Sequence, residues 1–238
     1  MNEIMRKFKI DLHCHSYFSS DGVSKPEEIV AIARSRGLDG FAITDHNTCD
    51  CVDYYRQAGL IREDGMPVDG LLIIPGQEIS TAEGHLLALG VVLPNLKGIS
   101  AHEAVQMIHA KGGVAVAPHP YDIFRAGIRE KVLDSLELDA IEVFNAATTL
   151  GYCNRRARAY AERKGAAMTA GSDAHLPQAV GVSYSILEME TLTVQGVLAG
   201  IRNSREVVEN YLSTKEALRK TFHNLFRIKA KKINFNLK

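Results

Sequence analysis

The stretch KIDLHCHS, residues 9–16, places two histidines two positions apart immediately after a short apolar run. Alternate side chains of an extended chain point to the same face, so we expect His13 and His15 to project together from one strand. Such a pair is compatible with a packed core pair, a proton relay or part of a metal site. A metal site would need further ligands from other parts of the chain.

Short apolar runs alternate along the chain with segments of helical periodicity. The runs that we interpret as strands are 8–11, 40–44, 71–75, 85–93, 113–117, 140–144, 166–171 and 184–189. Helix start and stop signals predict helices between Ser24 and Gly37, between Ser100 and Gly112, and over 153–164. This alternation predicts repeated βα units around a parallel sheet.

The chain has 238 residues, 46% of them hydrophobic, with 28 basic and 28 acidic residues. A chain of this length can bury a full core, and its balanced charge points to neither nucleic acid nor a membrane surface. Four cysteines are too few and too irregularly spaced for a disulfide framework. Because the N-terminus lacks the apolar core of a signal peptide and no run approaches ~18 apolar residues, we expect a cytoplasmic protein.

The composition changes near residue 202. Residues 202–238 contain ten Lys and Arg against three Glu, a net charge of +7. A helical apolar stripe runs through this segment, formed by Leu218, Phe222, Leu225 and Phe226. We therefore expect one domain over residues 1–201 and a basic helical extension over residues 202–238 that packs on it. The alternative is that its charges attract phosphate or nucleic acid.

Candidate metal ligands lie at the edge of nearly every apolar run. In parallel α/β barrels the carboxyl ends of the strands converge on one face, so residues far apart in the sequence can meet there. The nine candidates are His13, His15, Asp21, His46, Glu78, His85, His119, Asp173 and His175. The other histidines, His102, His109 and His223, fall in helical patterns, and we interpret them as structural or exposed.

Six imidazoles and three carboxylates are more ligands than one tetrahedral zinc ion uses, so the set predicts two or three divalent metal ions. Three such ions against three carboxylates would leave a formal charge of about +3, which favours phosphate oxygens over neutral peptide bonds. Nitrogen and oxygen ligands without thiolate suit Mn²⁺, Fe²⁺ or Zn²⁺, and ligand type does not choose among these.

Seven ordered motifs within residues 9–190 resemble those of the PHP (polymerase and histidinol phosphatase) phosphoesterase family. They are DLHCHS, SSDG, TDHN, GQEIS, GHLLALG, APHP and GSDAH. The resemblance implies a distorted seven-stranded (β/α)7 barrel with up to three divalent metals at the carboxyl ends of its strands. It also implies phosphoesterase or nuclease activity.

The resemblance further implies a division of the ligands among the metals. His13, His15, Glu78 and Asp173 would hold the first metal, and Asp21, His46 and His175 the second. Glu78 would bridge to a third, which His85 and His119 complete. Without His85 the cluster would be binuclear.

Four further residues are candidates for supporting roles. Asp11 and Asp45 each precede a ligand, and such a carboxylate either orients a ligating imidazole or serves as a buried hydrogen-bond acceptor. Glu142 ends a strand and is a candidate for the same orienting role. Arg125, six residues beyond His119, would either clamp a substrate phosphate or lie on the surface.

The leading hypothesis is hydrolysis of a phosphate ester by a hydroxide that the metals activate. The sequence contains no G-x-S-x-G elbow, P-loop or G-x-G-x-x-G fingerprint. We expect a nucleotide or short oligonucleotide as substrate, no membrane association and no stable protein partner. Two alternatives stay open, a histidinol-phosphatase-like enzyme for small molecules and a non-catalytic metal-binding PHP module in an assembly.

Overall fold

The structure is a computed structural model that describes residues 4–148 and 150–211. Its α-helices are α1 (Pro26–Ser35), α2 (Asp50–Gln57), α3 (Ala101–Ala110), α4 (Glu130–Leu133), α5 (Gly151–Lys164) and α6 (Val194–Asn203). Its strands are β1 (Arg6–Cys14), β2 (Gly40–Ile43), β3 (Leu72–Ile74), β4 (Gly76–Ser80), β5 (His85–Leu89), β6 (Val114–Ala117), β7 (Ala140–Asn145), β8 (Ala167–Gly171), β9 (Tyr184–Met189) and β10 (Glu206–Val208).

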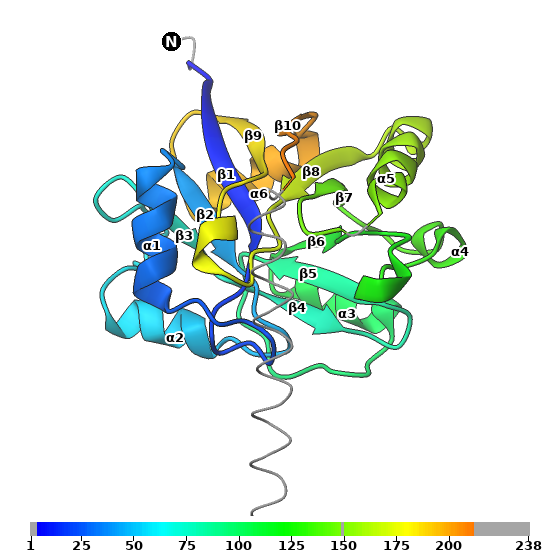
Figure 1. Cartoon of the computed structure of the whole chain (residues 1–238), viewed down its shortest axis with the longest axis horizontal. Coiled ribbons are helices and arrows are strands. Elements are labelled where there is room, and N and C mark those ends of the chain that lie inside the picture. The colour runs from blue at the N-terminus through cyan, green and yellow to red at the C-terminus, as the bar shows by residue number, and fades with distance from the viewer. Residues whose placement is uncertain (1–3, 149, 212–238) are drawn as a thin grey trace, which may run out of the picture.

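The strands form two five-stranded sheets (Figure 1). The first has the order β10-β9-β1-β2-β3, and the second has the order β4-β5-β6-β7-β8. β1, β2 and β3 are parallel, as are β6, β7 and β8, whereas β5 runs antiparallel to β4 and β6, and β9 runs antiparallel to β1 and β10. The sequence predicted βα units around a parallel sheet, and the structure has the parallel pairs but adds antiparallel strands to both sheets.

The reversal at β5 follows from the length of its connection. Only residues 81–84 separate β4 from β5, and the N–H of Thr81 donates to the carbonyl of Gly84 at 3.0 Å. A turn this short can join only antiparallel neighbours, since a parallel crossover needs about a dozen residues or more.

Isolated bridges connect the two sheets on both sides. Cys14, at the end of β1, pairs with Ala174 beyond β8, and His46, beyond β2, pairs with Glu78 in β4. Both bridges involve a candidate ligand or its neighbour, so the sheets meet where the candidate site lies. The fold is mixed α/β, and a closed seven-stranded (β/α)7 barrel is not confirmed.

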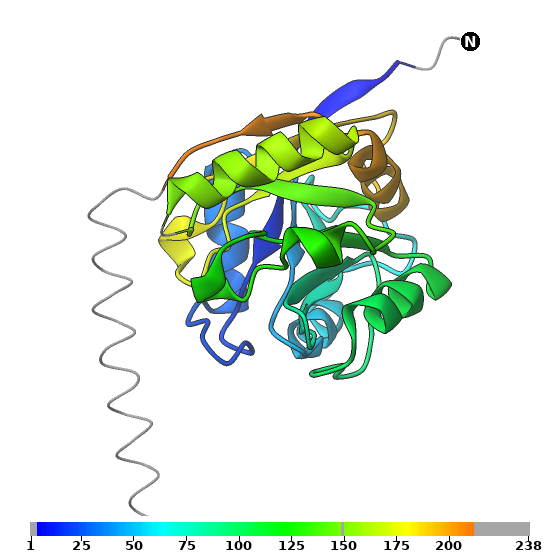
Figure 2. The same cartoon turned by 90° about the vertical axis from the view of Figure 1, so that its right-hand side faces the viewer.

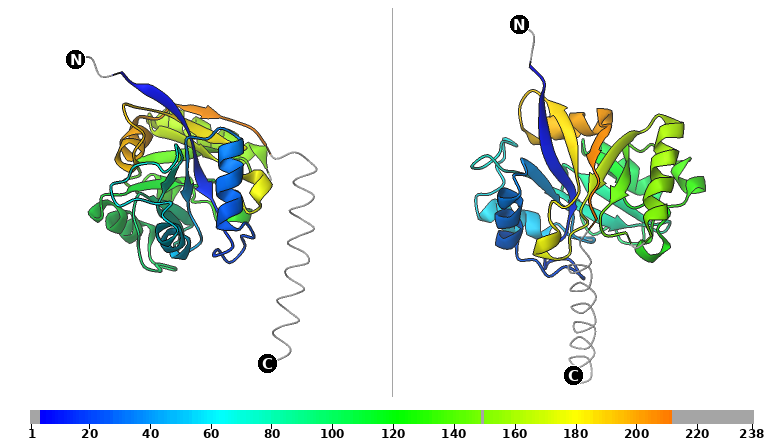
Figure 3. Two further views of the ribbon diagram at one scale, coloured as in Figure 1. Left: turned by 90° about the vertical axis from the view of Figure 1, so that its left-hand side faces the viewer. Right: turned by 45° about the horizontal axis from the view of Figure 1, so that its top comes forward.

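The helices cover the outside of the sheets. α1 and α2 lie beside β1, β2 and β3 (Figures 1 and 3), and α5 runs along β7 and β8 (Figure 2). α3 packs on β5 and β6, and α6 packs on β8 and β9. The inner core between the sheets takes side chains from both, including Ile10, Leu72, Leu87, Val116 and Leu187. Each buried side chain of this size contributes about 1.5–3 kcal/mol, so this core fixes the two sheets relative to each other.

The predicted helices form, with ends that match their capping signals closely. Ser100 caps α3 and accepts a hydrogen bond from the N–H of Glu103 at 3.2 Å. Pro26 opens α1, and Gly165 closes α5 in the left-handed conformation. α2, α4 and α6 were not predicted from the sequence.

The end of the described chain belongs to the first sheet. α6 ends at Asn203, and β10 pairs with β9. The predicted stripe of Leu218, Phe222, Leu225 and Phe226, together with His223, lies outside the described residues. Within the described part of the chain, no helix has the length and apolar character needed to cross a membrane.

Candidate metal centre

The nine candidate ligands converge at one end of the two sheets, and we call them the Glu78-centred cluster. Seven of the nine line a cavity of about 330 Å³. The other two, His13 and His15, are fully buried. His85 is the first residue of β5, but β5 is antiparallel to its neighbours, so its beginning lies beside the carboxyl ends of β4 and β6. The structure thus brings together all nine side chains that the sequence singled out.

Glu78 lies at the centre of the cluster, with imidazoles around both carboxylate oxygens. Its Oε2 lies 3.2 Å from Nε2 of His13, 3.2 Å from Nε2 of His15 and 3.4 Å from Nδ1 of His46. Its Oε1 lies 2.8 Å from Nδ1 of His85 and 2.9 Å from Nε2 of His119. Both oxygens of this carboxylate are therefore placed where divalent metal could be bound.

Asp173 completes the group around His13 and His15. Its Oδ1 lies 3.4 Å from Nε2 of His15 and 3.8 Å from Nε2 of His13. Its Oδ2 accepts hydrogen bonds from Arg125 and, at 3.2 Å, from Nδ2 of Asn145. One oxygen of Asp173 therefore faces the cluster while the other is held by protein donors.

Asp21 joins the cluster through His46 and His175. Its Oδ2 lies 2.9 Å from Nε2 of His175 and 3.5 Å from Nε2 of His46. Its Oδ1 accepts a hydrogen bond from the hydroxyl of Ser19 at 2.9 Å, and Ser19 also accepts one from the N–H of His46 at 3.2 Å. Ser19 thus ties the loop of Asp21 to the loop of His46.

Several ligand atoms of the cluster are buried without a hydrogen-bond partner. Among the described residues these include Nε2 of His15 and Oδ1 of Asp173, which face each other, and Nδ1 of His46 and of His85. Buried polar atoms are almost always satisfied, so a group of unsatisfied nitrogen and oxygen atoms that face one another is a fitting site for cations. Imidazole and carboxylate donors without thiolate suit Mn²⁺, Fe²⁺ or Zn²⁺. The cluster fits divalent metal ions.

The electrostatics of the cluster keep its carboxylates ionised. Burial would raise the pKa of Glu78, but His46, His13 and His85 more than offset it and hold the pKa well below its usual value. Burial acts in the same direction on Asp173, and Arg125 together with His13 keeps its pKa well below the usual value. Both carboxylates are therefore ionised at neutral pH.

Glu142 contacts His13 rather than the centre of the cluster. Its Oε1 lies 3.1 Å from Nδ1 of His13, and its Oε2 accepts hydrogen bonds from the N–H of His119 at 2.7 Å and from Nδ2 of Asn145 at 2.9 Å. A proton held on Nδ1 leaves the Nε2 lone pair of His13 directed at Glu78 and Asp173. This contact has the geometry that the orienting role expected for Glu142 requires.

Asp11 and Asp45 contact serines rather than imidazoles. Both oxygens of Asp45 accept hydrogen bonds at 2.6 Å, from the N–H and the hydroxyl of Ser16. Asp11 accepts from the N–H and hydroxyl of Ser172, at 2.9 Å and 2.6 Å, and from the N–H of Gly181 at 2.7 Å. Of the two roles open from the sequence, the geometry is that of buried acceptors, and each aspartate fastens a loop that carries a neighbouring ligand.

Sequence reasoning missed the residues that hold the cluster from outside. Ser16 and Ser172 are each adjacent to a candidate ligand, and each donates to an aspartate close in sequence to another ligand. A Ser and an Asp near ligands on different strands could therefore have indicated these pairs. Asn145, which donates to both Glu142 and Asp173, follows no pattern that the sequence offers.

The backbone is held in uncommon conformations at two of the candidate ligands. His119 has a φ of 32° and Asp173 a φ of 49°, in the left-handed region that non-glycine residues rarely adopt. Such conformations persist only where the surrounding structure enforces them, and they concentrate at functional sites.

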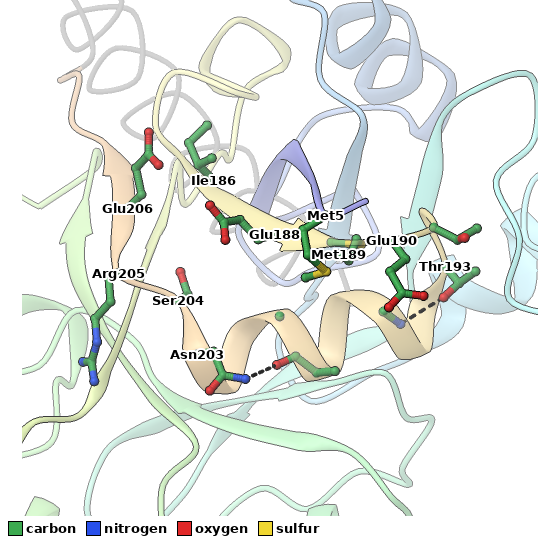
Figure 4. Close-up of a pocket in the computed structure, with 14 residues that line it drawn as sticks. Met5, Ile186, Glu188, Met189, Glu190, Thr193, Asn203, Ser204, Arg205 and Glu206 are labelled. Atoms are coloured by element: carbon green, nitrogen blue, oxygen red, sulfur yellow. Dashed lines mark hydrogen bonds between the residues drawn. The ribbon is translucent and has the colours of Figure 1, made fainter. Parts of the chain in front are cut away.

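A second cavity, of about 760 Å³, contains none of the candidate ligands. It lies between β9, β10 and α6, beside Met5, which directly precedes β1, and is lined by Glu188, Arg205 and Glu206 among others (Figure 4). The candidate ligand His13 lies toward the opposite end of β1. Although this cavity is larger, the candidate metal ligands that line a cavity all line the smaller one.

Comparison with known proteins places the chain among phosphoesterases. A model of the PHP-associated family matches residues 151–205. An uncharacterized protein of Methanocaldococcus jannaschii is 33% identical over 61% of this chain and 86% of the relative. A probable phosphatase of Enterobacter sp. (strain 638) is 30% identical over 73% of this chain and 81% of the relative. A 5′-3′ exoribonuclease of Haemophilus influenzae is 40% identical over 48% of this chain and 43% of that enzyme.

A solved structure shares the fold. Endonuclease Q, in complex with a 27-mer duplex that carries an abasic lesion, matches with a TM-score of 0.62 over 85% of this chain and 58% of its own, at 15% identity. Together, the site and the relatives define a hydrolase that acts on phosphate esters. The chain belongs to the PHP family, as its ordered motifs predict.

Proposed function

We propose that the Glu78-centred cluster holds two or three divalent metal ions and hydrolyses the phosphate esters of nucleotides or short oligonucleotides. The observation that carries this proposal is the position of Glu78, whose two oxygens each face a different set of imidazoles within 3.4 Å. A single structural ion would leave one of these sets without a role.

We divide the cluster into three ligand groups that share Glu78. His13, His15 and Asp173 approach one another around its Oε2, and His85 with His119 lies at its Oε1. Asp21, His46 and His175 form the remaining group. We assign one ion of the class Mn²⁺, Fe²⁺ or Zn²⁺ to each group.

Each part of the site has a separate task in the reaction. Bound divalent ions supply Lewis acidity, which activates water and polarises the phosphate. Glu142 holds the proton on Nδ1 of His13, so that Nε2 faces the cluster. Asp11 and Asp45 fix the ligand loops through Ser172 and Ser16. Arg125 lies in the wall of the cavity beside Asp173, where its guanidinium can donate hydrogen bonds to a phosphate oxygen.

The size of the cavity and the relatives favour a nucleotide or the end of an oligonucleotide. A volume of about 330 Å³ lies at the small end of the ~300–1,000 Å³ typical of ligand pockets, which suits a terminal phosphate and its sugar. The names of the relatives, a probable phosphatase and a 5′-3′ exoribonuclease, support the same substrates. The bridges Cys14–Ala174 and His46–Glu78 support a distorted PHP-type (β/α)7 barrel as part of the proposal.

The decisive experiment is metal analysis of the purified protein combined with a screen of phosphate esters. We expect two or three divalent ions per chain and hydrolysis that is lost on chelation and restored by Mn²⁺. Asp173→Ala and His15→Ala should abolish turnover, whereas His102→Ala, which changes an exposed histidine of α3, should not.

Two results would contradict the proposal. Less than one equivalent of metal with no activity in Mn²⁺, Fe²⁺ or Zn²⁺ would indicate a non-catalytic module. Hydrolysis of small phosphomonoesters such as histidinol phosphate, with none of nucleotides or short RNA, would replace the nucleotide substrate by a small metabolite.

A further inference from the structure

Phe124 is a large apolar side chain exposed beside the cluster. It belongs to a short 3₁₀ turn, Ile123–Arg125, that follows His119, and 71% of its surface is exposed. Among the exposed large apolar side chains of the described residues, it is the one that lines the metal cavity. An exposed aromatic ring does not gain the stabilising free energy of burial. A ring kept exposed at the mouth of a functional cavity is therefore a candidate for ligand contact.

The exposure of Phe124 is enforced by hydrogen bonds around Asp122. This fully buried carboxylate accepts a hydrogen bond from the N–H of Phe124 at 3.0 Å and another from the hydroxyl of Thr148. The carbonyl of Asp122 also accepts the N–H of Gly127 at 2.8 Å. The turn is therefore anchored from both of its ends and from the loop after β7.

The backbone of the same turn is strained. Tyr121 has a φ of 71° and Ala126 a φ of 50°, both left-handed conformations of non-glycine residues. Gly127 has no room for a side chain, because a Cβ there would lie 2.2 Å from the carbonyl oxygen of His119. Strain that the structure maintains beside a reaction site indicates that the presented side chain has a function there.

From these observations we propose that the ring of Phe124 stacks on the nucleobase of the substrate while the phosphate lies in the Glu78-centred cluster. The inference rests on the proposed function and names the part of the substrate that is recognised. The phosphate and sugar would occupy the cavity of about 330 Å³, so the base would lie at its rim, where Phe124 stands. Phe offers a flat π face and no hydrogen-bonding group, which suits any base without reading its identity.

The test compares two substrates that share phosphate and sugar but differ in the base. The wild-type protein with Mn²⁺ should hydrolyse adenosine 5′-monophosphate with a higher kcat/KM than ribose 5-phosphate. Phe124→Ala should lower kcat/KM for the nucleotide by about 10- to 100-fold, the range expected from loss of one base–aromatic stack, and leave ribose 5-phosphate unchanged. Phe124→Tyr, which keeps the ring, should retain the preference.

Binding of the base can also be followed without catalysis. The chain contains no tryptophan, so Phe124→Trp introduces a single tryptophan at the proposed stacking position, and its emission can be excited selectively over that of the tyrosines. Adenosine 5′-monophosphate should quench its emission, and ribose 5-phosphate should not. Ile123→Ala is the matched control for the kinetic test, since Ile123 is 59% exposed on the same turn but does not line the cavity.

The outcomes separate this inference from the proposed function. Equal losses for both substrates in Phe124→Ala, or equal effects of Ile123→Ala and Phe124→Ala, would overturn the stacking role and indicate a structural role or a protein contact for the turn. No preference for the nucleotide in the wild type, with active hydrolysis of both esters, would also overturn it but leave the phosphoesterase intact. If no ester is hydrolysed, the proposed function fails, and quenching of Phe124→Trp still decides whether a base binds.

Discussion

Glu142 and His13 are in direct contact in the buried wall of the cluster, with Oε1 of Glu142 3.1 Å from Nδ1 of His13. Both side chains are essentially inaccessible to solvent, so no water can replace either partner. Oε2 of Glu142 also accepts hydrogen bonds from the backbone N–H of His119 and from the side-chain amide of Asn145. Glu142 is therefore the common acceptor for three donors. One carboxylate therefore holds both the imidazole of His13 and the backbone segment that carries His119.

Replacement of Glu142 by Gln should weaken metal binding about 10- to 100-fold. Gln offers a single acceptor oxygen, so its amide group must face one of the three donors that Glu142 now accepts. Competition with a chelator of known affinity measures the change.

The control for this variant is Glu162→Gln, which alters an exposed carboxylate on α5. We expect wild-type metal affinity in the control. Unchanged affinity in Glu142→Gln, with the fold intact by circular dichroism, would contradict the orienting role of Glu142.

The variant His85→Ala should lose one metal ion and keep the others. His85 contacts the cluster through Oε1 of Glu78 at 2.8 Å, on the side away from His13 and His15. Metal analysis should therefore show a decrease of about one equivalent with partial loss of turnover. A metal content equal to that of the wild type would show that His85 is no ligand, and loss of all metal would show that the groups are not separate.

The positions of the candidate ligands could be predicted because they follow from a general property of strands. His13, His46, His119 and Asp173 each lie at or just beyond the carboxyl end of a strand, and such ends converge without any special sequence signal. His85 lies in the cluster for a different structural reason. It begins an antiparallel strand, so the start of that strand lies beside the carboxyl ends of its neighbours.

The division of the strands into two sheets could not be predicted. The run LLIIP leads directly into GQEIS, and only Pro75 separates β3 from β4, which belong to different sheets. No local sequence signal marks this change of sheet, because it depends on the strands with which β3 and β4 pair. The direction of β9 likewise depends on its pairing with β1 at a distance of about 180 residues in sequence.

α6 was not predicted because its sequence contains two glycines, and each makes the free energy of helix formation less favourable by about 1 kcal/mol relative to alanine. The structure explains one of them, since a Cβ at Gly196 would lie 2.8 Å from the carbonyl oxygen of Thr191. Tertiary packing therefore outweighs the local preference here.

Ser16→Ala should lower the free energy of unfolding by about 1–3 kcal/mol, because the fully buried Ser16 hydroxyl donates to a carboxylate oxygen of Asp45 that has little access to water. Urea denaturation of the metal-free protein measures this effect separately from metal binding. Ser35→Ala, on the exposed face of α1, should change stability by no more than about 0.5 kcal/mol. Equal effects in the two variants would show that the Asp45–Ser16 pair does not hold the loops together.

Arg125 has protein partners as well as access to the cavity. Its Nε donates to the carbonyl of Ala147 at 3.1 Å, and its Nη1 donates to Asp173, while the side chain is 18% exposed. The guanidinium is therefore already oriented, with part of its surface directed at the space where a substrate phosphate would lie.

Replacement of Arg125 by Lys should lower kcat/KM for phosphate esters by about 10-fold or more while leaving the metal content unchanged. A lysine cannot hold Asp173, the carbonyl of Ala147 and a phosphate oxygen at once, because it lacks the planar fork of donors, and a hydrogen bond to a charged group contributes about 1.5–3 kcal/mol. Steady-state kinetics with metal analysis on the same samples checks both parts, and Arg129→Lys, an exposed arginine that does not line the cavity, is the control. Loss of metal in Arg125→Lys would mean that Arg125 acts only by holding Asp173, whereas unchanged kcat/KM would mean that it does not touch the substrate.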